Sequence, residues 1–304
     1  AIDCRSAACA GVGQDGDGWP AVGPNITATP PPTPRPAATT VSSSGLPTDP
    51  AALVNGLPVE RFAILPPDVA ENVRTIFARG QALGRDPRAF AKMGDSISLS
   101  EHYFARFDWG GYNLGIYTKL QPAIDYYRGS FARVSQAVRS GARAGDALRP
   151  GLGDAALCRA DEHRLACEFR LHNPSVVLIR VGTNDLAPGD AFEPALRQSI
   201  AYSIEQGVIP VIVTKADRSE GSNRHNETMR ALAAEYAIPL WDYDAAAATL
   251  PNRGLSGDSI HLTMYAEDDY TDPAALTFGY PLSDLTGLFM LDAIRRTVAG
   301  EEAQ

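Results

Sequence analysis

Three short segments of the sequence hold side chains that could share one nucleophilic reaction. In Gly94-Asp95-Ser96 a serine hydroxyl could attack a carbonyl carbon, provided that a base takes its proton. Further along the chain Asp258 precedes His261 by three residues. At this spacing a carboxylate can fold back onto the imidazole Nδ1, which fixes the tautomer and leaves Nε2 free as a base. The pattern predicts a triad of Ser96, His261 and Asp258.

The third segment, Gly182 to Asp185, contains an amide that could stabilise negative charge. The Asn184 side chain can donate an N–H to the oxyanion of a tetrahedral intermediate, and Gly182 lets a substrate approach the backbone. Each segment alone has an ordinary structural interpretation, since these residue types are common in turns and helix caps. Together they supply a nucleophile, an oriented base and an oxyanion donor.

Alternating helix and strand signals from about residue 58 predict an α/β domain that would position these side chains. The expected strands are 89–93, 175–181, 208–214 and 238–242, and the expected helices lie near 68–82, 97–107, 120–139, 191–206, 223–236 and 281–298. Ser96 and Asn184 each follow an expected strand. Because open parallel sheets carry their active sites at the carboxyl ends of the strands, we expect the two side chains to meet there.

The order Ser96, Asn184, Asp258 and His261 resembles that of the SGNH hydrolase superfamily, also called GDSL-like esterases and lipases. The resemblance covers about residues 58 to 300. It implies a three-layer α/β/α, flavodoxin-like sandwich with a central parallel sheet of about five strands. It also implies hydrolysis of carboxylic esters through an acyl-enzyme, without a cofactor, with Ser96 as nucleophile and His261 and Asp258 as base and acid.

The resemblance further implies an oxyanion hole made by the backbone N–H of Ser96, the Asn184 amide and a glycine N–H. The glycine of the family best matches Gly145, in the segment Arg143 to Ala147. Gly141 and the adjacent pair at positions 110 and 111 are the alternatives.

The sequence departs from the commonest family pattern in its details. Ile97 stands where leucine gives the GDSL name, and Leu262 stands where proline often follows the catalytic histidine. Residues 264–277 are expected to form an insertion that adjoins the base and shapes the substrate pocket. The stretch from Cys158 to Cys167 lies in another expected insertion.

Two alternatives keep the fold but change the function. One is a carbohydrate deacetylase of the acetylxylan type, in which exposed aromatic rings could stack on sugars. The candidate rings are Trp109, Tyr112, Tyr117, Tyr126 and Tyr127, although helical spacing explains Tyr126 or Tyr127 as buried. The other is a non-catalytic binding module tethered by a linker; the presence of all four catalytic residue types argues against it. The expected partner is therefore a small-molecule or acylated-polysaccharide ester.

Composition excludes several classes of function. The net charge of -9 provides no cluster of Lys and Arg for nucleic acid, and no apolar run approaches the roughly 20 residues of a membrane span. The other histidines have no partners at metal-ligand spacing and are interpreted as structural or surface residues; these are His102, His163, His172 and His225.

The chain ahead of the predicted catalytic domain (58–304) divides into a short segment, 1–19, and a Pro/Thr/Ser-rich linker, 20–57. The linker composition cannot bury enough apolar surface to offset its ordering entropy. Asp15 and Asp17 alternate in a glycine-rich turn, as in calcium loops, but lack the further acidic ligands of such loops. They form a calcium candidate, with a plain acidic turn as the alternative.

The four cysteines form two close pairs whose spacings are unlike those of zinc ligands. This pattern predicts two disulfides, Cys4-Cys9 and Cys158-Cys167, in an oxidising compartment, with free buried thiols as the alternative. The sequence begins at Ala1 rather than at a methionine. We therefore expect a secreted protein whose leader has been removed, unless the chain was trimmed.

Overall fold

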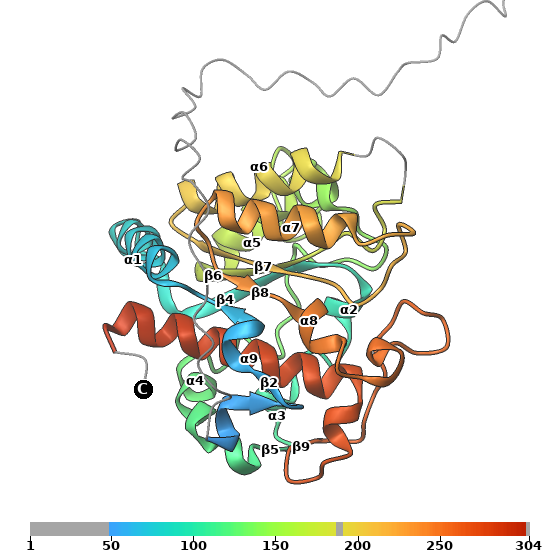
Figure 1. Cartoon of the computed structure of the whole chain (residues 1–304). Helices are drawn as coiled ribbons and strands as arrows, with labels where there is room; N and C mark the ends of the chain where they lie inside the picture. Colours follow the sequence, from blue (N-terminus) through green and yellow to red (C-terminus); the bar gives the residue numbers. More distant parts are fainter. Residues whose placement is uncertain (1–48, 187–190, 302–304) are drawn as a thin grey trace, which may run out of the picture. The chain divides into compact units, whose positions relative to one another are not determined.

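A computed structural model describes residues 49–186 and 191–301 of the 304-residue chain (Figure 1). The predicted Cys4-Cys9 disulfide, the calcium candidate at Asp15 and Asp17, the segment 1–19 and most of the linker lie outside the described residues. Residues 50–57, predicted as the end of the linker, belong to the folded part. Ala51 and Val54 are buried in the core. Residues 50–57 supply apolar side chains for the core, which the preceding Pro/Thr/Ser-rich part of the predicted linker lacks.

Five strands form the main sheet, in the order β3-β8-β7-β6-β4. They are β3 (Ala63–Ile64), β4 (Asp86–Gly94), β6 (Pro174–Arg180), β7 (Ile209–Val213) and β8 (Leu240–Trp241). Strands β4, β6, β7 and β8 are parallel and nearly all their residues are buried, as expected for strands covered on both faces. The edge strand β3 pairs with β8 in the antiparallel sense, so the predicted parallel sheet is correct except at this edge.

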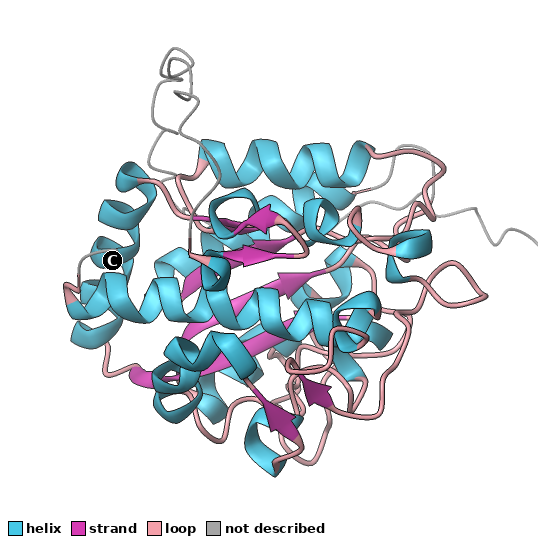
Figure 2. Cartoon of the chain, turned by 60° about the horizontal axis from the view of Figure 1, so that its bottom comes forward, coloured by secondary structure: helices cyan, strands magenta, loops and turns pink. Residues whose placement is uncertain are grey.

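Helices cover both faces of the sheet (Figures 1 and 2). One layer contains α5 (Arg164–His172), α6 (Phe192–Glu205) and α7 (Arg224–Glu235), and the other contains α1 (Pro67–Ala82) and α9 (Gly279–Ala299). The predicted three-layer α/β/α sandwich is confirmed. Short helices complete the described part: α2 (Ser96–Leu99), α3 (Arg106–Trp109), α4 (Gln121–Tyr126) and α8 (Tyr243–Ala247).

Two expected helices are shorter than predicted. The helix expected at 97–107 is divided into α2 and α3, because Phe104 has a left-handed backbone (φ 68°) and its N–H donates to Asp284 Oδ2 at 2.7 Å. The helix expected at 120–139 ends with α4, shortly before Gly129, whose φ is 89°. The other four expected helices match α1, α6, α7 and α9.

The winding of the sheet reverses at β4. Strands β6, β7 and β8 follow on one side of β4, whereas a single parallel bridge joins Gly94 to Val138 on the other side. Ligands of open parallel sheets bind outside the carboxyl ends of the strands at such a reversal. Gly94, the last residue of β4, must be small there, since an added Cβ would lie 2.2 Å from Ser98 Oγ.

The insertion expected at 264–277 is tied to the segment after the nucleophile. Its strand β9 (Asp268–Asp269) pairs with β5 (Tyr112–Asn113), and the buried Asp268 accepts from Arg106 Nη1 at 3.1 Å. Burial raises the pKa of Asp268 to about 6, although Arg106 opposes this shift. Elsewhere, the predicted disulfide between Cys158 and Cys167 is formed.

In the part of the chain that the structure describes, no helix is both long enough and apolar enough to cross a membrane.

Candidate active site

The structure brings the three predicted triad residues into one line of hydrogen bonds. Ser96 Oγ lies 2.9 Å from His261 Nε2, and His261 Nδ1 lies 2.6 Å from Asp258 Oδ2. An ionised carboxylate can only accept, so Nδ1 carries the proton and the Nε2 of a neutral imidazole is free to accept from Ser96. The arrangement can activate the hydroxyl of Ser96.

The charge of Asp258 is strongly stabilised. The hydrogen bond from the His261 ring, followed by bonds from the Ile260 N–H, the Ser256 hydroxyl and the His261 N–H, holds the pKa of Asp258 far below its ordinary value. Asp258 is nevertheless about half exposed, so these hydrogen bonds, rather than burial, keep its carboxyl group ionised. Asp258 therefore remains an acceptor for His261 into the acid range.

A tight loop holds Asp258 and His261. Leu255 and Leu262 form an antiparallel bridge at its base, and the left-handed backbone of Ser259 (φ 60°) turns the chain between them. Leu262, which stands where the family that the sequence resembles often has proline, is buried. The loop therefore takes its shape from backbone pairing and an apolar anchor.

Ser96 is the first residue of α2, directly after the carboxyl end of β4. Asp95 caps this helix, since its carboxylate accepts the Ile97 N–H at 3.0 Å, and burial raises the pKa of Asp95. The first N–H groups of a helix have no partner inside it, so the N–H of Ser96 can serve a ligand. Asp95 shapes the turn that presents Ser96.

Asn184 lies beyond the carboxyl end of β6, the strand that pairs with β4. Its Nδ2 donates to the Ala142 carbonyl at 3.1 Å, which leaves the second amide hydrogen available. Gly182 must be glycine here, because its φ is 112° and an added Cβ would lie 3.1 Å from the Phe192 ring. The buried His225 fixes this turn through a hydrogen bond from Nδ1 to the Gly182 carbonyl at 3.1 Å.

The hydrogen bond of Asn184 helps to decide which glycine N–H lies near the predicted oxyanion hole. Asn184 meets the loop at Ala142, next to the exposed Gly141, whose φ is 73°. Gly145 instead lies inside the short helix Ala144–Leu148, which packs on α5 and α6. The glycines at 110 and 111 follow α3, near the 264–277 insertion. The geometry favours Gly141, one of the predicted alternatives.

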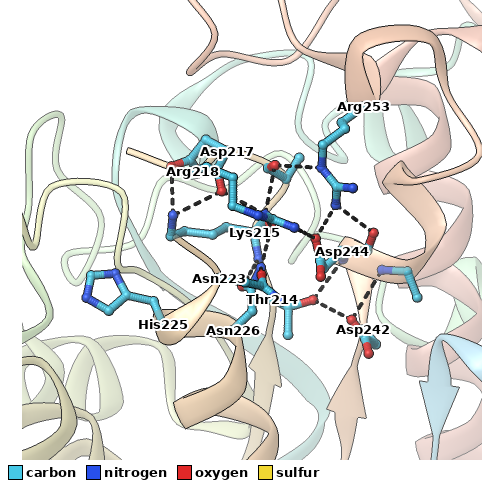
Figure 3. Close-up of polar contacts among 12 residues, drawn as sticks. Thr214, Lys215, Asp217, Arg218, Asn223, His225, Asn226, Asp242, Asp244 and Arg253 are labelled. Atoms are coloured by element: carbon cyan, nitrogen blue, oxygen red, sulfur yellow. Dashed lines mark hydrogen bonds and ion pairs between the residues drawn. The ribbon is translucent and has the colours of Figure 1, made fainter. Parts of the chain in front are cut away.

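Buried charges behind the site join the ends of β7 and β8 to the catalytic loops (Figure 3). Asp217 accepts from Lys215 Nζ at 2.8 Å and from Thr183 Oγ1 at 2.9 Å, and all three residues are buried. Thr183 immediately precedes Asn184. The ion pair of Asp217 and Lys215 therefore fixes the turn that presents Asn184.

A second group of charges anchors the loop that carries the base. Asp244 accepts from Arg218 at 2.5 Å and also from Arg253 (Figure 3). It accepts from Arg230 as well, at 2.7 Å. Burial alone would raise the pKa of Asp244, but these arginines outweigh it and lower the pKa. Arg253 precedes Gly254, whose carbonyl accepts the N–H of Thr263, two residues after His261. Asp244 is thereby linked, through Arg253 and Gly254, to both ends of the loop that carries Asp258 and His261.

These supporting charges were not among the residues predicted from the sequence. The run Lys215 to Arg218 directly after a buried strand was a local signal, since the carboxyl ends of the strands in such a sheet carry the site. The pairing of Arg218 with Asp244 gave no such signal, because the two residues are 26 positions apart.

The five aromatic residues considered for sugar stacking differ in exposure. Trp109 is 65% exposed, whereas Tyr117 and Tyr127 are buried and Tyr112 and Tyr126 are half-buried. Four of the five rings are thus at least partly occupied by packing inside the protein.

In the described ranges, one group of Cys, His and acidic side chains is close enough to share a metal ion: Cys158, Glu162 and Cys167. The two sulfurs are joined in the disulfide, and Glu162 pairs with Arg170 at 2.7 Å. Their geometry is explained without a metal.

Comparison with known proteins gives structural neighbours but no sequence relatives. No protein-family model and no curated protein matches the chain. Among solved structures, it is similar in fold to the psychrotrophic esterase EstA from Pseudoalteromonas sp., with 16% identity, a TM-score of 0.43, and coverage of 69% of this chain and 97% of that chain.

Two further neighbours have the same type of fold. The acetylxylan esterase Axe2 from Geobacillus stearothermophilus has 16% identity and a TM-score of 0.42, covering 67% of this chain and 94% of its own. A GDSL-like lipase from Bacteroides thetaiotaomicron has 14% identity and a TM-score of 0.40, covering 75% and 98%. At these values the similarity concerns the fold and indicates neither the reaction nor the substrate of this chain.

Proposed function

We propose that this protein is a serine hydrolase of the SGNH type that cleaves carboxylic esters. The observation that carries the proposal is the continuous line of hydrogen bonds from Ser96 Oγ through His261 to Asp258. A binding module would need neither an oriented base nor a nucleophile at the end of a strand.

The reaction would proceed in two halves. His261 Nε2 takes the proton of Ser96 while Oγ attacks the ester carbonyl carbon, which forms a tetrahedral intermediate. His261 then gives that proton to the leaving alcohol, and the acyl group stays on Ser96. A water, deprotonated by His261, attacks the acyl-enzyme, and collapse of the second intermediate returns the proton to Ser96 and releases the carboxylic acid.

The oxyanion would be held by donors from the ends of two neighbouring strands. The N–H of Ser96 and the second amide hydrogen of Asn184 are the first two, and the exposed Gly141 supplies the third from the loop that Asn184 contacts. Each such donor acts most strongly on the negative charge that develops in the transition state.

Exposed apolar side chains follow each catalytic segment closely in sequence. Leu99 comes three residues after Ser96, Leu186 two after Asn184, and Met264 three after His261, and all three are largely exposed. Isolated exposed apolar residues are ordinary on protein surfaces, but three that each closely follow a segment of the proposed site in the sequence favour a substrate with an apolar part. We therefore favour simple esters over acetylated polysaccharides, because four of the five rings considered for sugar stacking are at least partly buried.

Hydrolysis of p-nitrophenyl acetate, butyrate and octanoate, with acetylated xylan in parallel, tests the proposal. We expect release of p-nitrophenol by the wild type, none above background with Ser96→Ala, and full activity with the surface control Ser222→Ala. Absence of hydrolysis of every ester by a folded wild type would instead support the binding module, and faster release of acetate from xylan would support the deacetylase.

A further inference from the structure

A hollow of about 300 Å³ lies beside the Gly141 loop. Arg139, Ser140, Gly141, Ala142, Asp146 and Arg149 contribute to its walls. Two hydrogen bonds connect these walls to the catalytic residues. The N–H of Arg139 donates to the Gly94 carbonyl at 3.1 Å, two residues before Ser96, and the Ala142 carbonyl accepts from Asn184. The hollow therefore adjoins the proposed oxyanion hole.

The walls of the hollow carry unneutralised positive charge. Arg139 is exposed, and its side chain makes no hydrogen bond or ion pair with any residue in the described ranges. Arg149 is 62% exposed and reaches Asp146 only at 3.9 Å. Asp146 is the acidic group of the walls, and its Oδ2 already accepts the N–H of Arg143 at 3.0 Å.

Neighbouring arginines add to this charge. Arg164, which lines a small adjoining cavity, donates to the carbonyls of Gln136 and Val138 at 2.7 and 3.0 Å, and the carboxylate whose charge acts on it is the same Asp146. The exposed Arg143 lines the same cavity. The positive surface thus stands beside the site of a chain whose net charge is -9.

We propose that this hollow is a substrate subsite for an anionic group, a carboxylate or a phosphate, carried by the ester. The inference rests on the proposed esterase function and names its substrate class. A guanidinium presents paired N–H donors that match the oxygens of either anion, and an open cationic cleft raises the local concentration of anionic ligands.

Matched esters separate charge from shape. Methyl 4-acetoxybenzoate, 4-acetoxybenzoate and 4-acetoxyphenyl phosphate share an acetyl ester and differ in the para group. The pair 4-nitrophenyl butyrate and mono-4-nitrophenyl succinate places the charge on the acyl side instead. At low salt we expect kcat/KM for at least one anionic ester to exceed that of its neutral partner by about tenfold, through local enrichment of the anion.

Substitutions in the hollow test whether its arginines cause the preference for anionic esters. We expect the double variant Arg139→Gln, Arg149→Gln to lose the preference for the anionic ester, while the neutral esters keep their kcat/KM within about twofold. In the wild type, raising NaCl from about 20 mM to about 0.5 M should also abolish the preference. The control Arg61→Gln with Arg74→Gln removes the same charge from exposed positions elsewhere and should leave the preference intact. A preference of equal size in the double variant, or none in the wild type, would overturn the subsite.

Binding provides a readout that needs no turnover. By calorimetry at low salt, 4-hydroxybenzoate or 4-hydroxyphenyl phosphate should bind the wild type and the control more tightly than the Arg139/Arg149 variant. Equal binding to all three overturns the subsite even if esters are cleaved. Failure of every ester to react, with the difference in binding kept, overturns the esterase proposal and leaves an anion-binding site.

Discussion

His261 Nε2 lies 2.9 Å from Ser96 Oγ, although 165 positions of the sequence separate the two residues. The strand end that presents Ser96 and the loop that presents His261 are each shaped locally, by the cap at Asp95 and by the turn at Ser259. Their alignment depends on the sheet and on the buried charges around Asp244.

Replacing Asp258 by asparagine should lower turnover by roughly four orders of magnitude, the cost that this change has in a serine protease triad, because an amide favours the wrong imidazole tautomer. In the wild type the pKa of Asp258 is held far below its ordinary value, so its carboxylate stays ionised at pH values where an ordinary aspartate is protonated. The profile of kcat/KM against pH should therefore show no protonation step near about pH 4, the ordinary range of a carboxyl. A step in that range would contradict this. The exposed Asp161→Asn is the control.

Asn184→Ala should reduce kcat by roughly two to three orders of magnitude, since one oxyanion donor is worth ~3 kcal/mol in the barrier. The melting temperature should change little, because Asn184 is partly exposed and makes one side-chain hydrogen bond within the described residues. Steady-state kinetics and thermal unfolding of the same preparations separate the two effects. An unchanged kcat would remove Asn184 from the oxyanion hole, and the exposed Asn113→Ala should match the wild type.

Gly141→Ala should reduce kcat about tenfold or more, because it disturbs an N–H that we propose to hold the oxyanion. Gly145→Ala should change kcat less than about twofold, because its N–H has no such role in the proposal. A Cβ at Gly141 meets no atom within 4 Å, but the φ of 73° disfavours a side chain, so the backbone and its N–H would shift. Kinetics of the two variants decide between the glycines. The reverse order of effects would restore Gly145 as the donor.

Asp244→Asn should lower the free energy of unfolding by about 3 kcal/mol at neutral pH, because three partly buried arginines lose a charged partner. The folded-state pKa of Asp244 lies below its ordinary value, so its contribution is complete above the unfolded-state pKa and is lost as pH falls.

Urea unfolding at about pH 7 and about pH 4 measures this dependence, since an unfolded aspartate titrates near the lower value. The difference between the wild type and Asp244→Asn should shrink at the lower pH. A constant difference would show that charge at Asp244 is not what stabilises the loop. Asp154→Asn, on the surface, is the matched control.

The candidate triad could be predicted because its signals are local. Asp258 and His261 are three residues apart, and Ser96 and Asn184 each follow an apolar run long enough to indicate a buried strand. The expectation that Ser96 and Asn184 follow neighbouring strands at the same edge of the sheet then came from the geometry of parallel sheets.

Features set by distant contacts were predicted less well. The edge strand Ala63–Ile64 is too short to show a periodicity, and its antiparallel direction depends on β8. The break at Phe104 depends on a hydrogen bond to Asp284, 180 positions away. The choice between Gly141 and Gly145 depends on the contact of Asn184 with Ala142 and on the short helix that begins at Ala144, and neither spacing nor composition encodes these features.

Labelling with a fluorophosphonate, followed by intact mass and peptide mapping, tests the central claim most directly. The wild type should take up one phosphonyl group, on Ser96, and Ser222→Ala should do the same. Ser96→Ala, shown by circular dichroism to be folded, should take up none. Persistent labelling of Ser96→Ala, or an adduct on another serine of the wild type, would contradict the assignment of Ser96 as the nucleophile.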